Sequence, residues 1–335
     1  METAELRPLS LGELLDRTFT LYRGNFLVFV GIMAIPAALG IPSTYLLLQL
    51  DFNMLGNPAS PAPPKLAVIW EFFALALAVS FVSALLYAIV AGAVTFAVSE
   101  ANLGRRATIA TAYKTAFAKA WRLLGVAINV VIRLIGISLA VGAVLGTIGA
   151  IIMIGITAAA SSAFSGNAAM QPAVAVAIVL FVLVLYAGIL AAIVYLGLRY
   201  AVAIPALMLE DLGVMASIRR SVQLTKGRRG HVFIALLLAW IISLVGLIVF
   251  YVPFYIPTLV QLSRNHAVPS WLSMMSSVSA AVGSSITSPV FLIVLVLCYY
   301  DTRIRKEAFD LQFMMASLDR SAPAPAPAPG SVPSA

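Results

Sequence analysis

The chain has 335 residues, of which 62% are hydrophobic and only 10% are charged, and its formal net charge at pH 7 is +8. A soluble domain is about 45–50% apolar and about 25% charged, so this composition excludes a soluble globular protein. Several uncharged stretches reach the roughly 20 residues that a helix needs to cross a hydrocarbon core about 30 Å thick. The sequence therefore predicts an all-α, polytopic membrane protein.

Six apolar stretches have the length of membrane-spanning helices. The third stretch lies within residues 123–160, which are too many for one helix perpendicular to the membrane. Either this span is strongly tilted, or its first third extends the preceding surface helix. The predicted spans lie at residues 26–49, 72–98, 134–160, 173–198, 232–260 and 272–298.

The positive charges are distributed unevenly between the two sets of loops. Of the 21 Lys and Arg residues, 18 fall in residues 1–25, 99–122, 199–230 and 299–320. Short loops rich in Lys and Arg stay on the cytoplasmic side. We therefore expect both termini on the cytoplasmic side of the membrane. These loops also account for the net charge, so nucleic-acid binding is not indicated.

Three of the basic segments have the apolar spacing of amphipathic helices. The first begins with Ser10 and Glu13 at the spacing of a capping box, and Gly227 is expected to end the third. Each follows a Leu-Gly pair and precedes two spans, which favours a threefold internal repeat. The alternative is that any amphipathic helix between spans looks like this. The candidate repeats are residues 9–98, 103–205 and 212–298.

The densest charged run, "YYDTRIRKEAFDLQFM", occupies residues 299–314, directly after an uncharged stretch. Such a run is an active site, a docking surface or the place where a membrane ends. Its spacing predicts an amphipathic helix over residues 301–318 that lies on the inner membrane surface, with its charges facing water and paired four residues apart. Residues 321–335 form an Ala/Pro-rich tail that we expect to be disordered. The expected pairs are Asp301 with Arg305, Arg303 with Glu307, and Lys306 with Asp310.

Three phrases carry a family resemblance: "LSLGELLDRTFTLYRGNFLVFVGIMAIP", "LEDLGVMASIRRSVQLTKG" and "YYDTRIRKEAFDL". Together they resemble the membrane domain found with glycerophosphoryl diester phosphodiesterases, which in bacteria also occurs alone. The resemblance covers most of residues 8–318. It implies a multi-span membrane protein, whereas the family's catalysis belongs to a separate soluble barrel with histidine and metal chemistry. This chain leaves no room for such a barrel of roughly 250 residues.

Residues that support catalysis are scarce. The two histidines, His231 and His266, fall on opposite sides of the membrane in the predicted topology. The single Cys298 excludes an intrachain disulfide, and we find no nucleophile motif, phosphate loop or metal-ligand spacing. We therefore expect a protein that is not an enzyme and has no catalytic, cofactor or metal site. A weakly patterned intramembrane enzyme is a third alternative.

Two polar residues precede or enter the third span. If Arg122 marks the inner boundary, Arg133 lies about 16 Å further along a helix, near the middle of the bilayer. An arginine there costs at least about 2.5–3.5 kcal/mol and is a candidate functional residue, with Asn129 one turn earlier. The alternative, which we favour, places the membrane boundary at Arg133 itself.

The sixth span carries hydroxyl groups along one face, just before Pro289. Hydroxyls beside a helix break line solute paths in transporters. Small hydroxylated residues also allow membrane helices to pack closely, which is the role we favour. These candidate residues are Ser273, Ser277, Ser284 and Ser288.

The segment "RRSVQLTKGRRGH" is a candidate binding site for anionic lipid headgroups, although the same charges also determine topology. We predict a scaffold or lipid-associated module, without catalytic machinery, in the lipid bilayer of a bacterial plasma membrane. The alternative is a small-solute or lipid transporter lined by the hydroxyl face of the sixth span. The sequence does not specify a protein partner. The candidate headgroup residues are Arg219, Arg220, Lys226, Arg228 and Arg229.

Overall fold

The computed structural model describes residues 9–54, 66–163, 170–264 and 269–307, and every regular element among them is helical. Six of these helices are long and apolar enough to cross a membrane. The prediction of an all-α polytopic membrane protein is therefore confirmed. The six helices are α2 (Phe26–Met54), α3 (Leu66–Asn102), α5 (Ala120–Ala163), α6 (Met170–Tyr200), α9 (Arg229–Ser263) and α10 (Ser270–Glu307).

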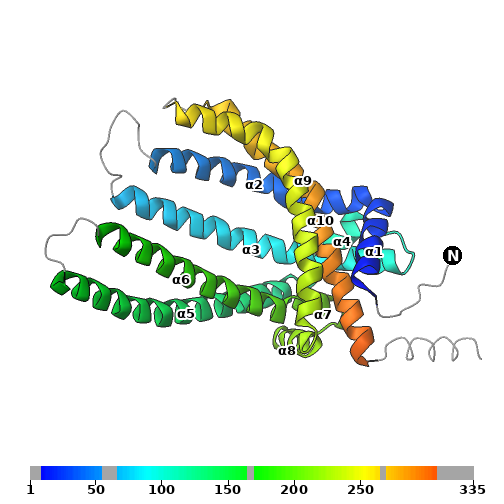
Figure 1. Ribbon diagram of the computed structural model, residues 1–335. Helices are drawn as coiled ribbons and strands as arrows, with labels where there is room; N and C mark the ends of the chain where they lie inside the picture. The colour runs from blue at the N-terminus through cyan, green and yellow to red at the C-terminus, as the bar shows by residue number, and fades with distance from the viewer. Residues whose placement is uncertain (1–8, 55–65, 164–169, 265–268, 308–335) are drawn as a thin grey trace, which may run out of the picture.

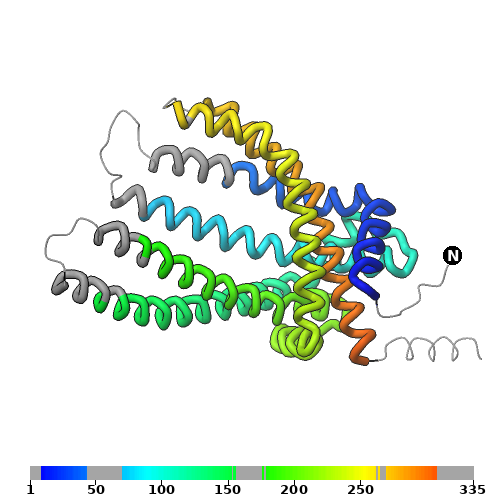
Figure 2. Tube along the Cα trace, viewed as in Figure 1, coloured from blue at the N-terminus to red at the C-terminus, as the bar shows by residue number. Residues whose placement is uncertain are grey.

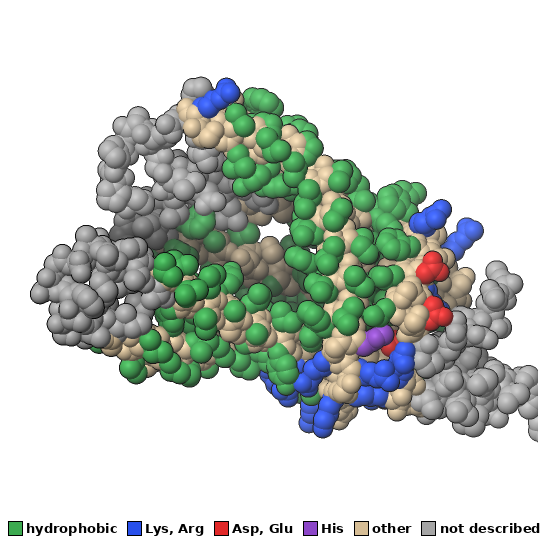
Figure 3. Space-filling view, viewed as in Figure 1, with side chains coloured by type: hydrophobic (Ala, Val, Ile, Leu, Met, Phe, Trp, Pro, Cys, Tyr) green, Lys and Arg blue, Asp and Glu red, His purple; other side chains and the backbone are tan. Residues whose placement is uncertain are grey.

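Four shorter helices gather at one end of the molecule, where α10 also ends (Figure 1). Positively charged side chains collect at this end as well (Figure 3), and we refer to it as the basic end. The short helices α1, α4 and α8 each precede two long helices, the order that the threefold repeat predicts; the repeat itself stays a prediction. The short helices are α1 (Leu11–Gly24), α4 (Ile109–Ala118), α7 (Ala203–Glu210) and α8 (Val214–Thr225).

Local signals in the sequence set the ends of the short helices. Ser10 accepts a hydrogen bond from the backbone N–H of Glu13, whose carboxylate accepts one from the N–H of Ser10, so the predicted capping box is present. Helix α8 ends at Thr225, and Gly227 follows with a φ of 84°, a conformation that glycine adopts without a Cβ clash. The predicted helix stop is therefore confirmed.

Helix α10 forms the centre of the packed part of the molecule. It contacts α9 and α2 most extensively and also reaches α1, α3 and α8. Its side chains are buried almost without interruption from Pro289 to Thr302, in agreement with an apolar character on all sides. The spans α5 and α6 instead expose large apolar side chains such as Ile151 and Leu183. These helices diverge from α9 and α10 away from the basic end (Figure 2), which leaves their surfaces for lipid.

Near some of the prolines inside the spans, a side chain of a neighbouring helix donates a hydrogen bond to a backbone carbonyl. A proline lacks the N–H that would bond to the carbonyl four residues earlier. Pro36 frees the carbonyl of Ile32 in α2, and the Tyr113 hydroxyl of α4 donates to that carbonyl at 2.7 Å. Burial raises the pKa of Tyr113 to about 12, so the hydroxyl keeps its proton at neutral pH.

Near two further prolines a neighbouring helix also supplies a donor, but it bonds to the carbonyl three residues before the proline and not to the one that the proline frees. In α10, Tyr22 of α1 donates at 2.6 Å to the carbonyl of Ile286, beside Pro289. In α9, Ser279 of α10 donates to the carbonyl of Phe250, beside Pro253. The helices are therefore joined near the positions where their own hydrogen bonding is interrupted.

Replacement of Tyr113 by Phe is expected to destabilise the protein by about 1–3 kcal/mol, because the carbonyl of Ile32 loses its donor. Thermal unfolding in detergent, followed by circular dichroism, measures the effect. Tyr186→Phe is the matched control, since the Tyr186 side chain is exposed on α6. In a Pro36→Ala background the effect should shrink, because the substituted residue would supply the backbone N–H that the proline lacks. An equal loss in both backgrounds would contradict the proposed role of Tyr113.

The structure corrects several expected boundaries. Helix α4 ends at Ala118 and the chain turns at Lys119, so α5 is one separate helix that starts well before the predicted residue 134. The predicted loop 199–230 contains the buried helix α7, which the charge pattern concealed. Helix α10 continues without a break to Glu307, so no separate surface helix begins at residue 301. Residues 308–318, with Asp310, and the tail 321–335 lie outside the described residues.

Candidate functional site at the basic end

A cluster of charged side chains joins α7, α8 and α10 at the basic end. The Arg220 Nε donates to both carboxylate oxygens of Glu210, at 3.1 and 2.9 Å, and its Nη2 pairs with Glu307. Glu307 also accepts from Arg303 at 3.2 Å. The Tyr299 hydroxyl completes the cluster by donating to Glu210 at 2.7 Å. We call these five residues the ion cluster; it connects α10 to α7 and α8, which follow each other in the chain and are distant from α10 in sequence.

The ion cluster changes the interpretation of one candidate headgroup residue. Burial lowers the pKa of Arg220, but the hydrogen bonds and charge of Glu210, and then those of Glu307, outweigh this effect and raise the pKa. Arg220 is therefore a paired structural cation. Its assignment to lipid headgroups stays a prediction, since both carboxylates that pair with Arg220 come from other helices and no local pattern in the sequence indicated them.

A second contact fixes the start of α1 against α10 and α9. Asp301 is 1% exposed and accepts from the Arg305 Nε at 2.9 Å and from the backbone N–H of Leu9 at 2.9 Å. Arg305 in turn donates to the carbonyl of Leu9 at 2.7 Å. The His231 Nε2 of α9 lies 3.6 Å from the same carboxylate. One acidic side chain thus holds three segments together.

These contacts correct the prediction for the charged run. The expected pairs of Asp301 with Arg305 and Arg303 with Glu307 are present, at 2.9 and 3.2 Å. The charges do not simply face water, however, because Asp301 is buried and the Lys306 Nζ donates to the backbone carbonyls of Gln223 and Lys226. Periodicity along one helix could not reveal neighbours from α1, α8 and α9. The run is a docking surface within the protein itself.

A cavity of about 410 Å³ lies between α5, α6 and α8, and three arginines line it. Arg133 extends from α5, Arg199 from the end of α6 and Arg219 from α8. The rest of the lining is one amide and three apolar side chains. We call this cavity the arginine pocket. The other lining residues are Met215, Ile218, Val222 and Gln223.

Arg133 makes its contacts with residues of the basic end. Its Nη1 lies 3.3 Å from the Tyr200 hydroxyl, its guanidinium lies 5.5 Å from the centre of the Tyr200 ring, and its Nη2 lies 3.9 Å from the sulfur of Met215. Asn129 reaches the same sulfur at 4.0 Å. Because Met215 belongs to the amphipathic helix α8, these contacts favour a position for Arg133 at the membrane boundary.

Residues 176–311 match the family model of the membrane domain of glycerophosphoryl diester phosphodiesterase. The predicted resemblance is therefore confirmed for the segment that contains α7 to α10, which holds the ion cluster. Within the arginine pocket, Arg199 and Arg219 fall in the matched segment, while Arg133 precedes it. No curated protein and no solved structure matches the chain.

The matched segment contains the remaining candidate headgroup residues. Arg229 donates to the Tyr195 hydroxyl at 2.8 Å, and its guanidinium lies 4.8 Å from the centre of that ring. Lys226 and Arg228 are exposed, and their positive charges act on the nearby Lys306. We call Lys226, Arg228 and Lys306 the cation cluster. None of the three pairs with a carboxylate among the residues that the structure describes.

The hydroxyl groups of α10 bond mainly to their own helix. Ser277 donates to the carbonyl of Ser273 at 2.9 Å, and Ser284 donates to the carbonyl of Ala281 at 3.0 Å. Ser273 is buried, and Ser288 is half-buried. Since α10 packs along α9 on this part of its length, the contacts favour helix packing over a solute path.

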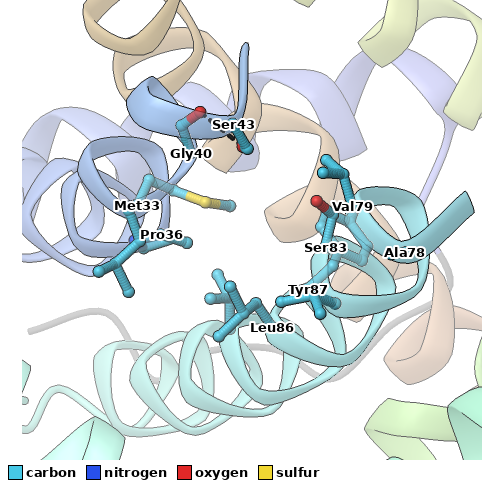
Figure 4. A pocket seen from close by; sticks show the side chains of 12 residues that line it. Met33, Pro36, Gly40, Ser43, Ala78, Val79, Ser83, Leu86 and Tyr87 are labelled. Atoms are coloured by element: carbon cyan, nitrogen blue, oxygen red, sulfur yellow. Dashed lines mark hydrogen bonds between the residues drawn. The ribbon is translucent and has the colours of Figure 1, made fainter. Parts of the chain in front are cut away.

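A separate cavity of about 330 Å³ lies between α2 and α3. Figure 4 shows Met33 and Pro36 of α2 facing Leu86 and Tyr87 of α3 across this space. The Ser43 hydroxyl on its rim already donates to the carbonyl of Gly40, at 2.8 Å. The lining is largely apolar and lacks convergent polar groups, so this cavity is suited to hydrocarbon and not to a polar ligand.

The described residues offer few groups that could bind a metal ion or a cofactor. Within the described ranges no group of three His, Cys, Asp or Glu side chains could hold a metal ion. His231 lies beside the buried Asp301 and is part of a structural contact, whereas His266 lies outside the described residues. The absence of catalytic, cofactor and metal sites stays a prediction.

Proposed function

We propose that this integral membrane protein is a non-catalytic scaffold or lipid-associated module, whose basic end binds anionic lipid headgroups. The cation cluster carries this proposal. Lys226 and Arg228 are exposed, and Lys306 is held beside them by the carbonyls of Gln223 and Lys226. Three positive charges so close together repel one another, and an anionic surface relieves that repulsion. Each basic residue near such a surface contributes about 1 kcal/mol.

The proposal places the basic end on the cytoplasmic face of a bacterial plasma membrane. The loops that the sequence predicts to lie inside contain 18 of the 21 Lys and Arg residues, which is the distribution that directs short loops to the cytoplasm. Both termini then lie on the cytoplasmic side, where anionic lipids give the membrane surface a negative potential. The packed short helices form a platform at headgroup level, while the diverging spans contact hydrocarbon.

The test replaces the two exposed cations together, as Lys226→Gln and Arg228→Gln, and compares the lipids that co-purify in native nanodiscs. The ratio of anionic to zwitterionic lipid should fall about thirtyfold, because two contributions of about 1 kcal/mol are lost. Arg264→Gln is the matched control, since it removes one exposed cation at the opposite end of the span. An unchanged ratio in the double variant would refute the proposal.

A further inference from the structure

The arginine pocket concentrates positive charge without compensation. Its lining contains three guanidinium groups and no acidic side chain. Among the described residues, no carboxylate lies within ion-pair distance of Arg133, Arg199 or Arg219. Like charges that share a partly enclosed space destabilise one another, so the arrangement is favourable only when an anion enters.

Arg199 is the most constrained of the three. Its Nε is inaccessible to solvent and has no hydrogen-bond partner among the described residues. Its guanidinium lies 5.8 Å from the centre of the Tyr200 ring, and the Ser221 hydroxyl of α8 donates to its backbone carbonyl at 3.0 Å. The end of α6 is thus fixed against α8. A buried donor with no acceptor is costly, and a ligand oxygen in the pocket would reduce that cost by pairing with the same guanidinium.

We infer that the arginine pocket binds the phosphate monoester headgroup of a membrane lipid. Guanidinium groups match phosphate oxygens with paired N–H donors. A phosphate monoester carries a charge of about −1.5 to −2 at neutral pH. It therefore balances the positive charge of three arginines better than a diester, which carries one negative charge. A volume of about 410 Å³ lies within the usual range of ligand pockets.

The surroundings of the pocket favour a lipid as the source of that phosphate. The apolar part of its lining, Ile218 and Val222, lies on α8. Next to Arg133, the α5 residues Ile132 and Ile135 are 63% and 54% exposed, and Leu190 of α6 is 53% exposed. These side chains are exposed on the two spans that contribute Arg133 and Arg199, so the acyl chains of a bound lipid would find apolar surface on the same helices. A soluble phosphate compound would leave this apolar surface unused.

This inference rests on the proposed function and adds a defined site to it. The cation cluster would attract anionic lipids in general, whereas the arginine pocket would select a monoester among them. The two sets of residues do not overlap, so they can be removed separately. Arg219 is the most informative position, because its side chain is exposed on α8 and its replacement leaves the core untouched.

The experiment uses the full-length protein in detergent and measures the retention of short-chain phosphatidic acid and phosphatidylglycerol by native mass spectrometry. The wild type should bind the monoester about tenfold more tightly than the diester, and Arg219→Gln should weaken monoester binding about tenfold by removing one charge-assisted contact. Arg133→Lys should also weaken it, since a point charge lacks the planar pair of donors. Arg106→Gln, an exposed cation of the same end outside the pocket, should bind like the wild type.

Four results would overturn the inference. Equal affinity for the monoester and the diester would remove the selectivity, and an equal loss in Arg106→Gln would reduce the effect to net charge. Displacement of the lipid by equimolar glycerol 3-phosphate or inorganic phosphate would assign the pocket to a soluble compound. If the Lys226 and Arg228 variant loses its general anionic enrichment while Arg219→Gln keeps full monoester binding, the inference fails and the proposed function stands.

Discussion

Replacement of Asp301 by Ala is expected to lower the free energy of unfolding by about 3–5 kcal/mol, the usual cost of removing one partner of a buried ion pair. The carboxylate is 1% exposed and accepts from both the Arg305 guanidinium and the backbone N–H of Leu9. Its loss leaves a partly buried cation and an unpaired N–H in the same place. Thermal unfolding in detergent measures the stability. The accessibility of a cysteine introduced into α1 measures the release of that helix.

The matched control is Asp16→Ala, which removes an exposed carboxylate of α1. It should change stability by less than about 0.5 kcal/mol. Asp301→Asn should fall between the two, because the amide oxygen still accepts from Leu9 but no longer balances Arg305. Similar shifts for Asp301→Ala and Asp16→Ala would show that the contact with Leu9 adds nothing to stability.

The second large effect is expected for Glu210→Gln, at about 2–4 kcal/mol. Glu210 accepts from Arg220 through both oxygens and from the Tyr299 hydroxyl, so the neutral amide disrupts contacts with α8 and α10 together. Side chains joined in one network are coupled. The double variant Glu210→Gln, Arg220→Gln should therefore lose less stability than the two single variants predict in sum.

Glu71→Gln supplies the comparison, since this carboxylate is exposed on α3 far along the chain from the ion cluster. Its unfolding temperature in detergent should match that of the wild type. Strict additivity of Glu210→Gln and Arg220→Gln would mean that the 2.9 Å contact between them contributes no coupling energy, contrary to this account of the ion cluster.

The spans were predictable because the need to satisfy backbone groups in hydrocarbon leaves a strong, local signal. Contacts between distant segments leave no such signal. Asp301 is buried by Leu9, a residue 292 positions away, so its helical pairing with Arg305 looked like an ordinary surface pair. Helix α7 was missed for a similar reason: its short apolar sequence lies inside a basic loop and carries no period of its own.

The candidate site was partly predictable. Arg133 stood out because it lies inside an apolar stretch, about 16 Å along a helix beyond Arg122, and Arg219 because it lies in a basic segment. Arg199 was missed, since a cation at the end of a span is the common topology signal. The feature that could have pointed to Arg199 is the next residue, Tyr200, whose ring lies near the guanidinium groups of both Arg133 and Arg199. Only the packing of α5 against α6 and α8 brings the three arginines together.

The hydrogen bonds between Leu9 and α10 have a consequence for biosynthesis. The backbone of Leu9 bonds to Asp301 and Arg305, so these bonds cannot form until the ribosome has made residue 305. At about 5–20 residues per second, the 292 positions between Leu9 and Asp301 take roughly 15–60 s to translate. During that interval α1 must wait at the membrane surface without its final partner. Helix α1 is thus synthesised before the other described helices and is among the last of them to reach its place.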